Sequence, residues 1–277
     1  MPSHFVLKKQ RLADGSIKKY KARLVADGNR QREWTYDLIS SPTAKQASVK
    51  ITFAMAAING YHTYMYDVKS AYLHADLDKD LYLLLPAFTG PSKLVKLHKA
   101  LYGLKQSGKL WNDLITKTLT DIGFIQLEAD KCMFIRKSEF EDTTIALHVD
   151  DLLIATNKPE YAAELKRNLE EKFGIIEDVS ESQTHLGIHI ERLENGSIKL
   201  SQPGYVDHIC SVLDYQHEKE THTPLPVSLQ LNCQSTSVDI TAFRQILGLL
   251  NHLVIHTRPD IIYRMSILAA HTAHPTQ

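Results

Sequence analysis

The chain has 277 residues, of which 43% are hydrophobic and 23% charged, and its 32 basic and 32 acidic residues give zero formal net charge. This length suffices for a full core and two or three subdomains. No apolar run is long enough to span a membrane, so we expect no membrane partner. Cys132, Cys210 and Cys233 show no metal-ligand spacing, and so sparse a set suits a reducing compartment.

The charge is unevenly distributed along this neutral chain. Lysine and arginine concentrate in residues 1–32 and again in 93–117, whereas acidic residues concentrate between 160 and 194. Two basic zones are compatible with a phosphate-binding face. The alternative is that these side chains are ordinary solvated surface cations.

In chain order, residues 8–11 and 18–25 predict two strands joined by a turn at Asp14-Gly15. A helix is predicted to begin with Ser41 as N-cap and Pro42 at its first position, and to end at Gly60. Residues 61–66 alternate as a strand that delivers Asp67 at its end, and 71–98 hold short strand pieces.

The remaining elements follow the same logic of periodicity and stop signals. Helices are predicted at 106–122 and 160–173, with Gly123 and Gly174 as their stops. The other predicted elements are strands at 132–136, 143–149 and 152–156, a hairpin of 186–192 and 197–200 around Asn195-Gly196, and helices at 204–213, 241–256 and 259–272, with a proline-rich loop at 223–226.

The middle of the chain therefore has the order strand, helix, strand, strand, helix, strand. This is the split βαβ order of a ferredoxin-like antiparallel sheet with helices on one face, an α+β fold. In such a sheet the first strand lies beside the central hairpin. Asp67 would then face Asp150 and Asp151.

Asp150 and Asp151 interrupt an apolar stretch, 145–155, that has the character of a buried hairpin. Burial and like-charge repulsion both disfavour a carboxylate pair there. Two Mg²⁺ ions shared with Asp67 would remove this penalty, which indicates metal-assisted phosphoryl transfer. The alternative is that Asp67 caps a turn and that the pair is a simple hairpin loop.

These residues also resemble a known family, the reverse transcriptases of copia-type LTR retrotransposons, with the yeast Ty elements as the nearest group. The resembling segments are 66–73 (YDVKSAYL) and 148–151 (HVDD) for the two catalytic motifs, 101–106 (LYGLKQ) with Trp111, 21–26 (KARLVA), 186–188 with 200–202 for the primer-contacting hairpin, and 257–261 (TRPDI). The resemblance spans essentially the whole chain, and the motifs occur in the family's order.

The resemblance implies a right-hand polymerase fold. Residues 1–60 would form partial fingers and the first palm helix, 61–200 the palm with an inserted fingers segment at about 71–105, and 201–277 a helical thumb or connection. It implies an RNA-directed DNA polymerase that adds dNTPs to a primer 3′-hydroxyl on an RNA or DNA template. Asp67, Asp150 and Asp151 would hold two Mg²⁺ ions, for which Mn²⁺ is a substitute.

It also implies the nucleotide site. Tyr72 would exclude a 2′-hydroxyl, Lys21 and Arg23 would reach the triphosphate, and Tyr102 and Gly103 would line the pocket. The alternatives are a packed core tyrosine at 72 and an exposed basic strand at 21–23. His148 replaces the family's usual Tyr or Phe, and it would contact primer or template together with Leu186 and Gly187.

The chain carries no motif of a ribonuclease H, integrase or protease, and it begins within the fingers region, so we expect a truncated piece of a polyprotein. If expressed from an intact element, it belongs in cytoplasmic virus-like particles, or in the nucleus. A degenerate, non-catalytic remnant that at most binds nucleic acid is the second hypothesis. A nucleotide cyclase is a third, but it explains neither the LYGLKQ segment nor the helical tail.

Overall fold

The computed structural model describes residues 1–11, 17–86, 90, 93–215, 223–225, 239–273 and 275. Within them the chain is a mixed α/β protein with six α-helices and antiparallel strand pairs, apart from one isolated parallel bridge. It divides into two compact units, Met1–Glu181 and Ser182–Gln277. No helix in the described ranges is long and apolar enough to cross a membrane.

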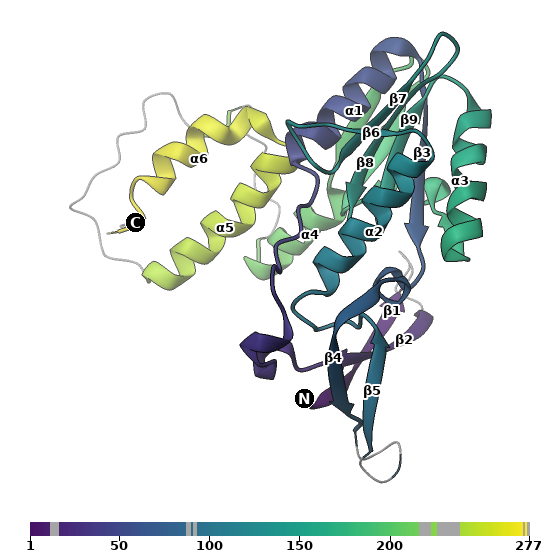
Figure 1. Cartoon of the computed structure of the whole chain (residues 1–277). Coiled ribbons are helices and arrows are strands. Elements are labelled where there is room, and N and C mark those ends of the chain that lie inside the picture. Colours follow the sequence, from purple (N-terminus) through teal and green to yellow (C-terminus); the bar gives the residue numbers. More distant parts are fainter. Residues whose placement is uncertain are drawn as a thin grey trace. The chain divides into compact units, whose positions relative to one another are not determined.

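A six-stranded antiparallel sheet with the order β10-β3-β9-β8-β7-β6 is the centre of the first unit (Figure 1). Its strands are β3 (His62–Val68), β6 (Ile125–Gln126), β7 (Met133–Lys137), β8 (Asp142–His148), β9 (Asp151–Thr156) and β10 (Ile176–Asp178). The helix α2 (Ser107–Asp121) lies between β3 and β8 in the sequence, and α3 (Pro159–Phe173) lies between β9 and β10. The four strands β10-β3-β9-β8 therefore have a split βαβ order, but its last strand is β10, which was not predicted, and the predicted last strand at 186–192 belongs to a separate sheet.

Both faces of this sheet are covered, which corrects the expectation of helices on one face. Every side chain from Leu152 to Thr156 in β9 is buried, although successive side chains of a strand point to opposite faces. The helix α1 (Gln46–Asn59) packs against β8 and β9, and α3 packs against β3 and β9. A strand buried on both faces loses the alternating pattern that would have revealed the second layer.

Two smaller sheets lie together at one end of this unit (Figure 1). They are the hairpin of β1 (Ser3–Arg11) and β2 (Ile17–Ala26) and the ribbon of β4 (Asp76–Leu84) and β5 (Leu94–Lys99). Ala26, Leu81, Leu83 and Leu104 form their shared core. The first hairpin was predicted, and its expected turn at Asp14-Gly15 lies outside the described residues.

The start of α1 corrects a prediction made from local sequence. The helix begins at Gln46 rather than at Pro42, and no side chain caps it locally. Instead, the Asp130 carboxylate accepts hydrogen bonds from the Lys45 backbone N–H at 2.9 Å and from the Ser48 hydroxyl at 2.6 Å. A partner distant in sequence therefore fixes the start of the helix. The predicted stop at Gly60 is confirmed by its left-handed conformation, with φ of 66°.

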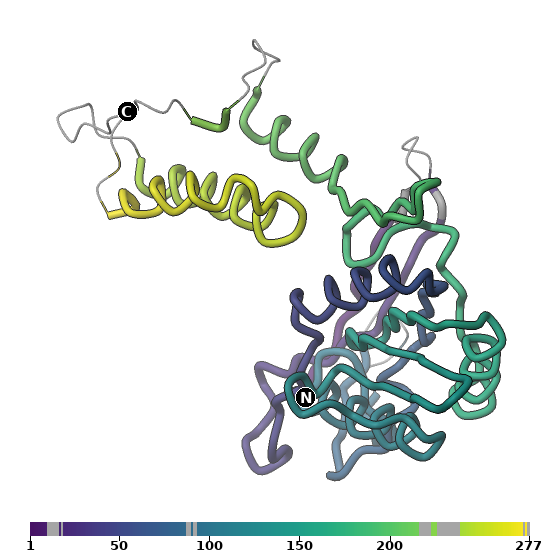
Figure 2. The backbone as a smooth tube through the Cα atoms, turned by 90° about the horizontal axis from the view of Figure 1, so that it is seen from above, coloured from purple at the N-terminus to yellow at the C-terminus, as the bar shows by residue number. Residues whose placement is uncertain are grey.

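In the described residues, the second unit combines a small sheet with three α-helices. Its elements are β11 (Thr184–His185), β12 (Ile188–Arg192), β13 (Ile198–Ser201), α4 (Pro203–Val212), α5 (Ile240–His256) and α6 (Ile262–Ala269). The helices α5 and α6 lie side by side (Figure 2) and share a core of Leu247, Val254 and Met265.

Two expectations for this region differ from the structure. The predicted strand at 186–192 begins only at Ile188, because Leu186 and Gly187 take positive φ angles of 50° and 79° and form a turn. The predicted helix at 259–272 is a short 3-10 turn, Pro259–Ile261, followed by α6. The compact unit begins at Ser182, so it includes the hairpin as well as these helices.

The contact between β2 and the turn at Gly103 generates the first prediction. A Cβ on Gly103 would lie 2.1 Å from the Ala26 carbonyl oxygen, whereas one on Gly60 would have nothing within 4 Å, and both residues have positive φ. We expect Gly103→Ala to lower the free energy of unfolding by about 2–4 kcal/mol and Gly60→Ala by only about 1 kcal/mol. Tryptophan fluorescence during urea unfolding measures both, because Trp34 and Trp111 lie in the first unit. Equal losses would contradict the clash.

Candidate active site

The acidic hairpin ends in a strained turn that two other elements hold in place. Between β8 and β9, Val149 adopts a φ of 60°, which is unfavourable for a β-branched residue. The Trp111 indole N–H of α2 donates to the Val149 carbonyl oxygen at 2.7 Å, and the Val68 N–H of β3 donates to the Asp150 carbonyl oxygen at 2.9 Å. The position of Asp150 is therefore fixed from both sides.

The strand register brings the predicted carboxylates to one end of the sheet. Asp67 of β3 is the direct cross-strand partner of Asp151 of β9, and Asp150 precedes Asp151 in the chain. Burial, together with the charges of Asp150 and Asp67, raises the pKa of Asp151 to about 6. Burial also raises the pKa of Asp150, with a contribution from Asp67. The positive charge near these three carboxylates is therefore too small to neutralise them.

A lysine that we had not assigned a role supplies part of this charge. The Lys69 ammonium contacts the Asp67 carboxylate at 2.5 Å and the Glu177 carboxylate at 2.6 Å. Glu177 is the cross-strand partner of Asp67 on β10. Burial lowers the pKa of Lys69, but its hydrogen bonds to the two carboxylates outweigh burial, so that the pKa is raised.

Two aromatic rings and two cations lie beside the carboxylates. The rings of Tyr72 and Tyr102 are 4.8 Å apart, and the Arg23 guanidinium lies 5.1 Å above the Tyr102 ring. Burial raises the pKa of both tyrosines, and the charge of Asp150 adds to this effect. Burial together with Arg23 lowers the pKa of Lys21. Four of the five residues predicted to bind nucleotide therefore lie close enough to the carboxylates for their charges to shift one another's pKa values.

Gly103, the fifth of these residues, lies close to the backbone of β2 and does not line an open nucleotide site. Its backbone lies against Ala26 at the end of β2, where the Ala26 N–H donates to the Tyr102 carbonyl oxygen at 2.8 Å. The absence of a side chain thus permits the 101–104 turn to pack on β2. Gly103 holds Tyr102 and Arg23 near each other, which is a positioning role.

The three residues predicted to contact primer or template are divided between the two compact units, with His148 in the first and Leu186 and Gly187 in the second. His148 is the cross-strand partner of Asp151, and burial lowers its pKa although Asp150 opposes this shift. The imidazole is thus biased towards its neutral form, which is less suited to a phosphate than we expected. Leu186 and Gly187 form the turn between β11 and β12 in the second unit.

No group of three or more His, Cys, Asp or Glu side chains in the described ranges is arranged to hold a metal ion. The donor chemistry of the three carboxylates nonetheless suits a hard divalent cation, and the raised pKa values of Asp150 and Asp151 indicate that these two lack counter-charge. The Asp67 carboxylate is paired with the Lys69 ammonium, so it would have to release this ammonium in order to bind a metal ion.

Sequence reasoning missed Lys69, Glu177 and the role of Trp111. Lys69 carried a signal, because it stands two positions after Asp67, next to the strand end, within a motif already singled out. Glu177 carried none, because its place depends on the pairing of β10 with β3. Trp111 was named as part of a segment that resembles the family, whereas the structure buries its ring to 1% exposure and uses its indole N–H to fix the hairpin.

Comparison with known proteins agrees with the segments that suggested this site. A family model described as reverse transcriptase (RNA-dependent DNA polymerase) matches residues 1–226. The retrovirus-related Pol polyprotein from transposon RE1 of Arabidopsis thaliana is 32% identical over 100% of this chain and 20% of its own length. The corresponding polyprotein from transposon TNT 1-94 of Nicotiana tabacum is 30% identical over 98% of this chain and 22% of its own.

A yeast relative is similar over almost the whole chain as well. The transposon Ty1-BR Gag-Pol polyprotein of Saccharomyces cerevisiae is 27% identical over 99% of this chain and 16% of its own length. The chain thus spans about a fifth of the length of these relatives. The match of the family model over most of the chain, together with these relatives, shows that the chain belongs to the reverse transcriptase (RNA-dependent DNA polymerase) family, as part of the copia-type retrotransposon Pol polyproteins.

Proposed function

We propose that this chain is the polymerase domain of such a polyprotein, adding deoxynucleotides to a primer 3′-hydroxyl on an RNA or DNA template. The observation that carries the proposal is the register of Asp67 with Asp151 beside Asp150, next to a cluster of two cations and two aromatic rings. Membership of the family supports the reaction class. Phosphoryl transfer of this kind depends on positioning and charge, so no protein nucleophile is needed.

Asp67, Asp150 and Asp151 would hold two Mg²⁺ ions. When bound, such ions lower the pKa of the attacking hydroxyl and neutralise the leaving pyrophosphate. Lys21 and Arg23 would bind the triphosphate, since they lie close enough to Asp150 to lower its pKa. Tyr72, held against Tyr102, would lie under the sugar.

For the architecture, we propose a right-hand polymerase. The β1–β2 hairpin and the β4–β5 ribbon, which share one core, are its fingers, within 1–60 and about 71–105. The six-stranded sheet is its palm, within 61–200, and the helices of 201–277 are its thumb or connection. In this arrangement Arg23 and Tyr102 lie where the fingers meet the palm.

One observation favours a second candidate, a non-catalytic domain that binds nucleic acid. The Lys69 ammonium neutralises Asp67 and bridges it to Glu177, as a permanent internal counter-ion would. If that contact persists in the presence of Mg²⁺, the carboxylates serve the fold alone. Primer extension distinguishes the two candidates.

The first functional prediction concerns Asp150. We expect Asp150→Asn to reduce primer extension in Mg²⁺ by about 1,000-fold, because removing one metal-binding carboxylate weakens a stabilisation worth several kcal/mol. The matched control is Asp121→Asn, at an exposed carboxylate at the end of α2, which should leave extension unchanged. Extension of equal rate by wild type and Asp150→Asn would sink the proposed mechanism.

Tyr72 tests the choice of sugar. We expect Tyr72→Ala to reduce the preference for dNTP over NTP by about 10- to 100-fold, because space for a 2′-hydroxyl opens. Tyr72→Phe keeps the ring and should keep the preference. Incorporation ratios from single-nucleotide extension measure both. A lower stability with unchanged selectivity in Tyr72→Ala would assign the ring to packing instead.

The raised pKa of Asp151 predicts a pH-dependent difference in stability between Asp151→Asn and wild type. The folded pKa of about 6 exceeds the ordinary 3.8, so the carboxyl contributes stability at low pH that is lost as the pH rises through about 6. In EDTA, the advantage of Asp151→Asn should therefore grow by about 1–2 kcal/mol from pH 4.5 to 7.5, after discounting for partial exposure. Urea unfolding at each pH measures it.

Adding Mg²⁺ provides the control for this prediction. A cation held by Asp151 stabilises the ionised form, so millimolar Mg²⁺ should reduce the advantage of the Asn variant at pH 7.5. Asp121→Asn should show no such dependence on pH or on Mg²⁺. An advantage that persists unchanged in Mg²⁺ would mean that Asp151 does not bind the ion.

A further inference from the structure

Four ionisable side chains form a row across one end of the six-stranded sheet. Glu177 of β10 is the cross-strand partner of Asp67 of β3, which is the partner of Asp151 of β9, which in turn is the partner of His148 of β8. Cross-strand partners project from the same face of a sheet, so three carboxylates stand next to one another. Like charges directly opposite each other are destabilising, and this row therefore needs counter-charge.

Lys69 supplies counter-charge at one end of the row. Its ammonium lies 2.5 Å from the Asp67 carboxylate and 2.6 Å from the Glu177 carboxylate. Burial and neighbouring carboxylates raise the pKa of Asp151, and the charge of Lys69 opposes this shift, so its field reaches the next carboxylate in the row. The ammonium therefore acts on two of the three carboxylates proposed to bind metal.

The backbone of Lys69 is held in place, while its side chain has a choice of partners. The Lys69 N–H donates to the Ile175 carbonyl oxygen at 3.2 Å, and the His74 Nε2 donates to the Lys69 carbonyl oxygen at 3.0 Å. The lysine stem is flexible, so the ammonium can change partners without a shift of the main chain. The Glu177 side chain is 47% exposed and that of Asp67 is 22% exposed. An ammonium that leaves Asp67 can therefore stay on Glu177, where water replaces the lost contact.

We propose that Lys69 is an exchangeable counter-ion, which neutralises Asp67 in the absence of metal and moves wholly onto Glu177 when the carboxylates bind a divalent cation. Glu177 is then a positioning residue, because it acts on the metal site only through Lys69. The exchange keeps Asp67 neutralised in both states. This inference rests on the proposed function, and it opposes the permanent counter-ion of the second candidate.

The first experiment titrates the full chain with Mn²⁺, without nucleotide or nucleic acid, and follows the free ion by electron paramagnetic resonance. Lys69→Met removes the competing ammonium, so Mn²⁺ should bind about 5-fold more tightly. Lys69→Arg should weaken binding about 5-fold, because a planar guanidinium holds a carboxylate through two hydrogen bonds and leaves it less readily. Lys69→Arg also keeps the positive charge, so it tests the exchange even if Lys69→Met does not fold.

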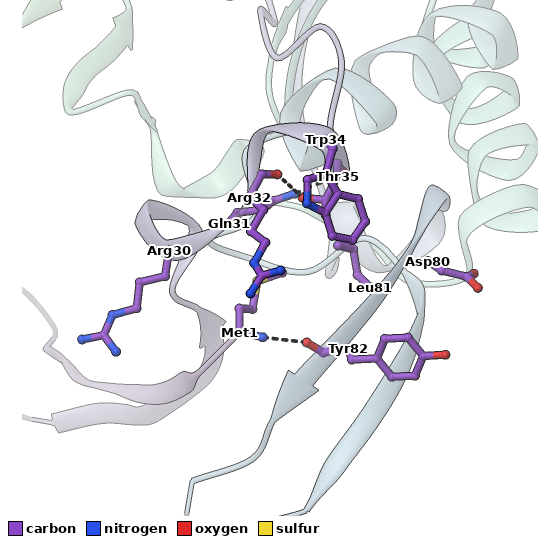
Figure 3. Close-up of a pocket in the computed structure, with 9 residues that line it drawn as sticks. All are labelled: Met1, Arg30, Gln31, Arg32, Trp34, Thr35, Asp80, Leu81 and Tyr82. Carbon is purple, nitrogen blue, oxygen red and sulfur yellow. Dashed lines mark hydrogen bonds between the residues drawn. The ribbon is translucent and has the colours of Figure 1, made fainter.

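The matched control is an ion pair of the same kind outside the site. The Lys96 ammonium of β5 contacts the Asp80 carboxylate of β4 at 2.7 Å. In Figure 3 the Asp80 carboxylate points away from the other labelled side chains. Lys96→Met and Asp80→Asn remove the same types of charge, and both should leave the affinity for Mn²⁺ unchanged.

A double-mutant cycle tests whether Glu177 acts through Lys69. Glu177→Gln alone should weaken Mn²⁺ binding about 3-fold, because the ammonium then has only Asp67 as a partner. In the Lys69→Met background the same change should have no effect, because no ammonium remains for Glu177 to hold. If Glu177 instead attracts the cation by its own charge, its effect persists or grows when Lys69 no longer neutralises it.

Three outcomes would overturn the exchange: no binding of Mn²⁺ by wild type, an affinity that is the same in both Lys69 variants as in wild type, or an effect of Glu177→Gln that survives in Lys69→Met. Primer extension separates such a failure from failure of the proposed function. A chain that extends primers although its Lys69 variants bind Mn²⁺ as wild type does refutes the exchange alone. One whose Mn²⁺ affinity follows Lys69 and Glu177 as expected, but that extends no primer, refutes the polymerase alone.

Discussion

The repulsion among Asp67, Asp150 and Asp151 is the constraint on which the site depends. Two antiparallel strands place Asp67 and Asp151 directly opposite each other, and no rearrangement of side chains alone removes that proximity. Burial and the neighbouring carboxylates raise the pKa values of Asp150 and Asp151. The nearby cations compensate this negative charge only in part. The Lys69 ammonium compensates Asp67 and Glu177, on the side of the sheet edge formed by β10. An additional cation next to Asp150 and Asp151 would relieve the remaining repulsion.

Backbone strain accompanies this electrostatic strain. A valine at a φ of 60° is disfavoured by about 1–3 kcal/mol, and it persists here because the surrounding contacts determine the turn. The Trp111 indole binds the carbonyl oxygen of that valine, while its ring packs against Phe173 of α3 with centroids 5.1 Å apart. The packing of α2 against α3 therefore holds the acidic turn, and the geometry of the carboxylates depends on this packing.

Much of the fold was accessible from sequence, because strong local signals coincide with real elements. Alternation and glycine stops located β3, α2 and α3, and the order of elements predicted that β3 lies beside the hairpin of β8 and β9. Errors arose where a distant partner replaced a local one. Asp130 displaced the expected Ser41 cap, and positive φ angles at Leu186 and Gly187 turned part of a predicted strand into a turn. In the site, the three carboxylates and the residues around Tyr72 could be predicted from their residue types and motifs. Glu177 could not, because its place depends on which strands pair.

The segment from Leu101 to Trp111 connects these features physically. Its Tyr102 carbonyl and Gly103 backbone anchor β2, which carries Arg23. Its Gln106 side chain fixes the loop that presents Arg32 and Trp34. Its Trp111 holds the acidic turn. A shift of this segment would therefore move Arg23, the loop that carries Arg32 and Trp34, and the acidic turn together. Tight constraint on its sequence is therefore expected from packing and hydrogen bonding alone, even where its side chains do not contact substrate.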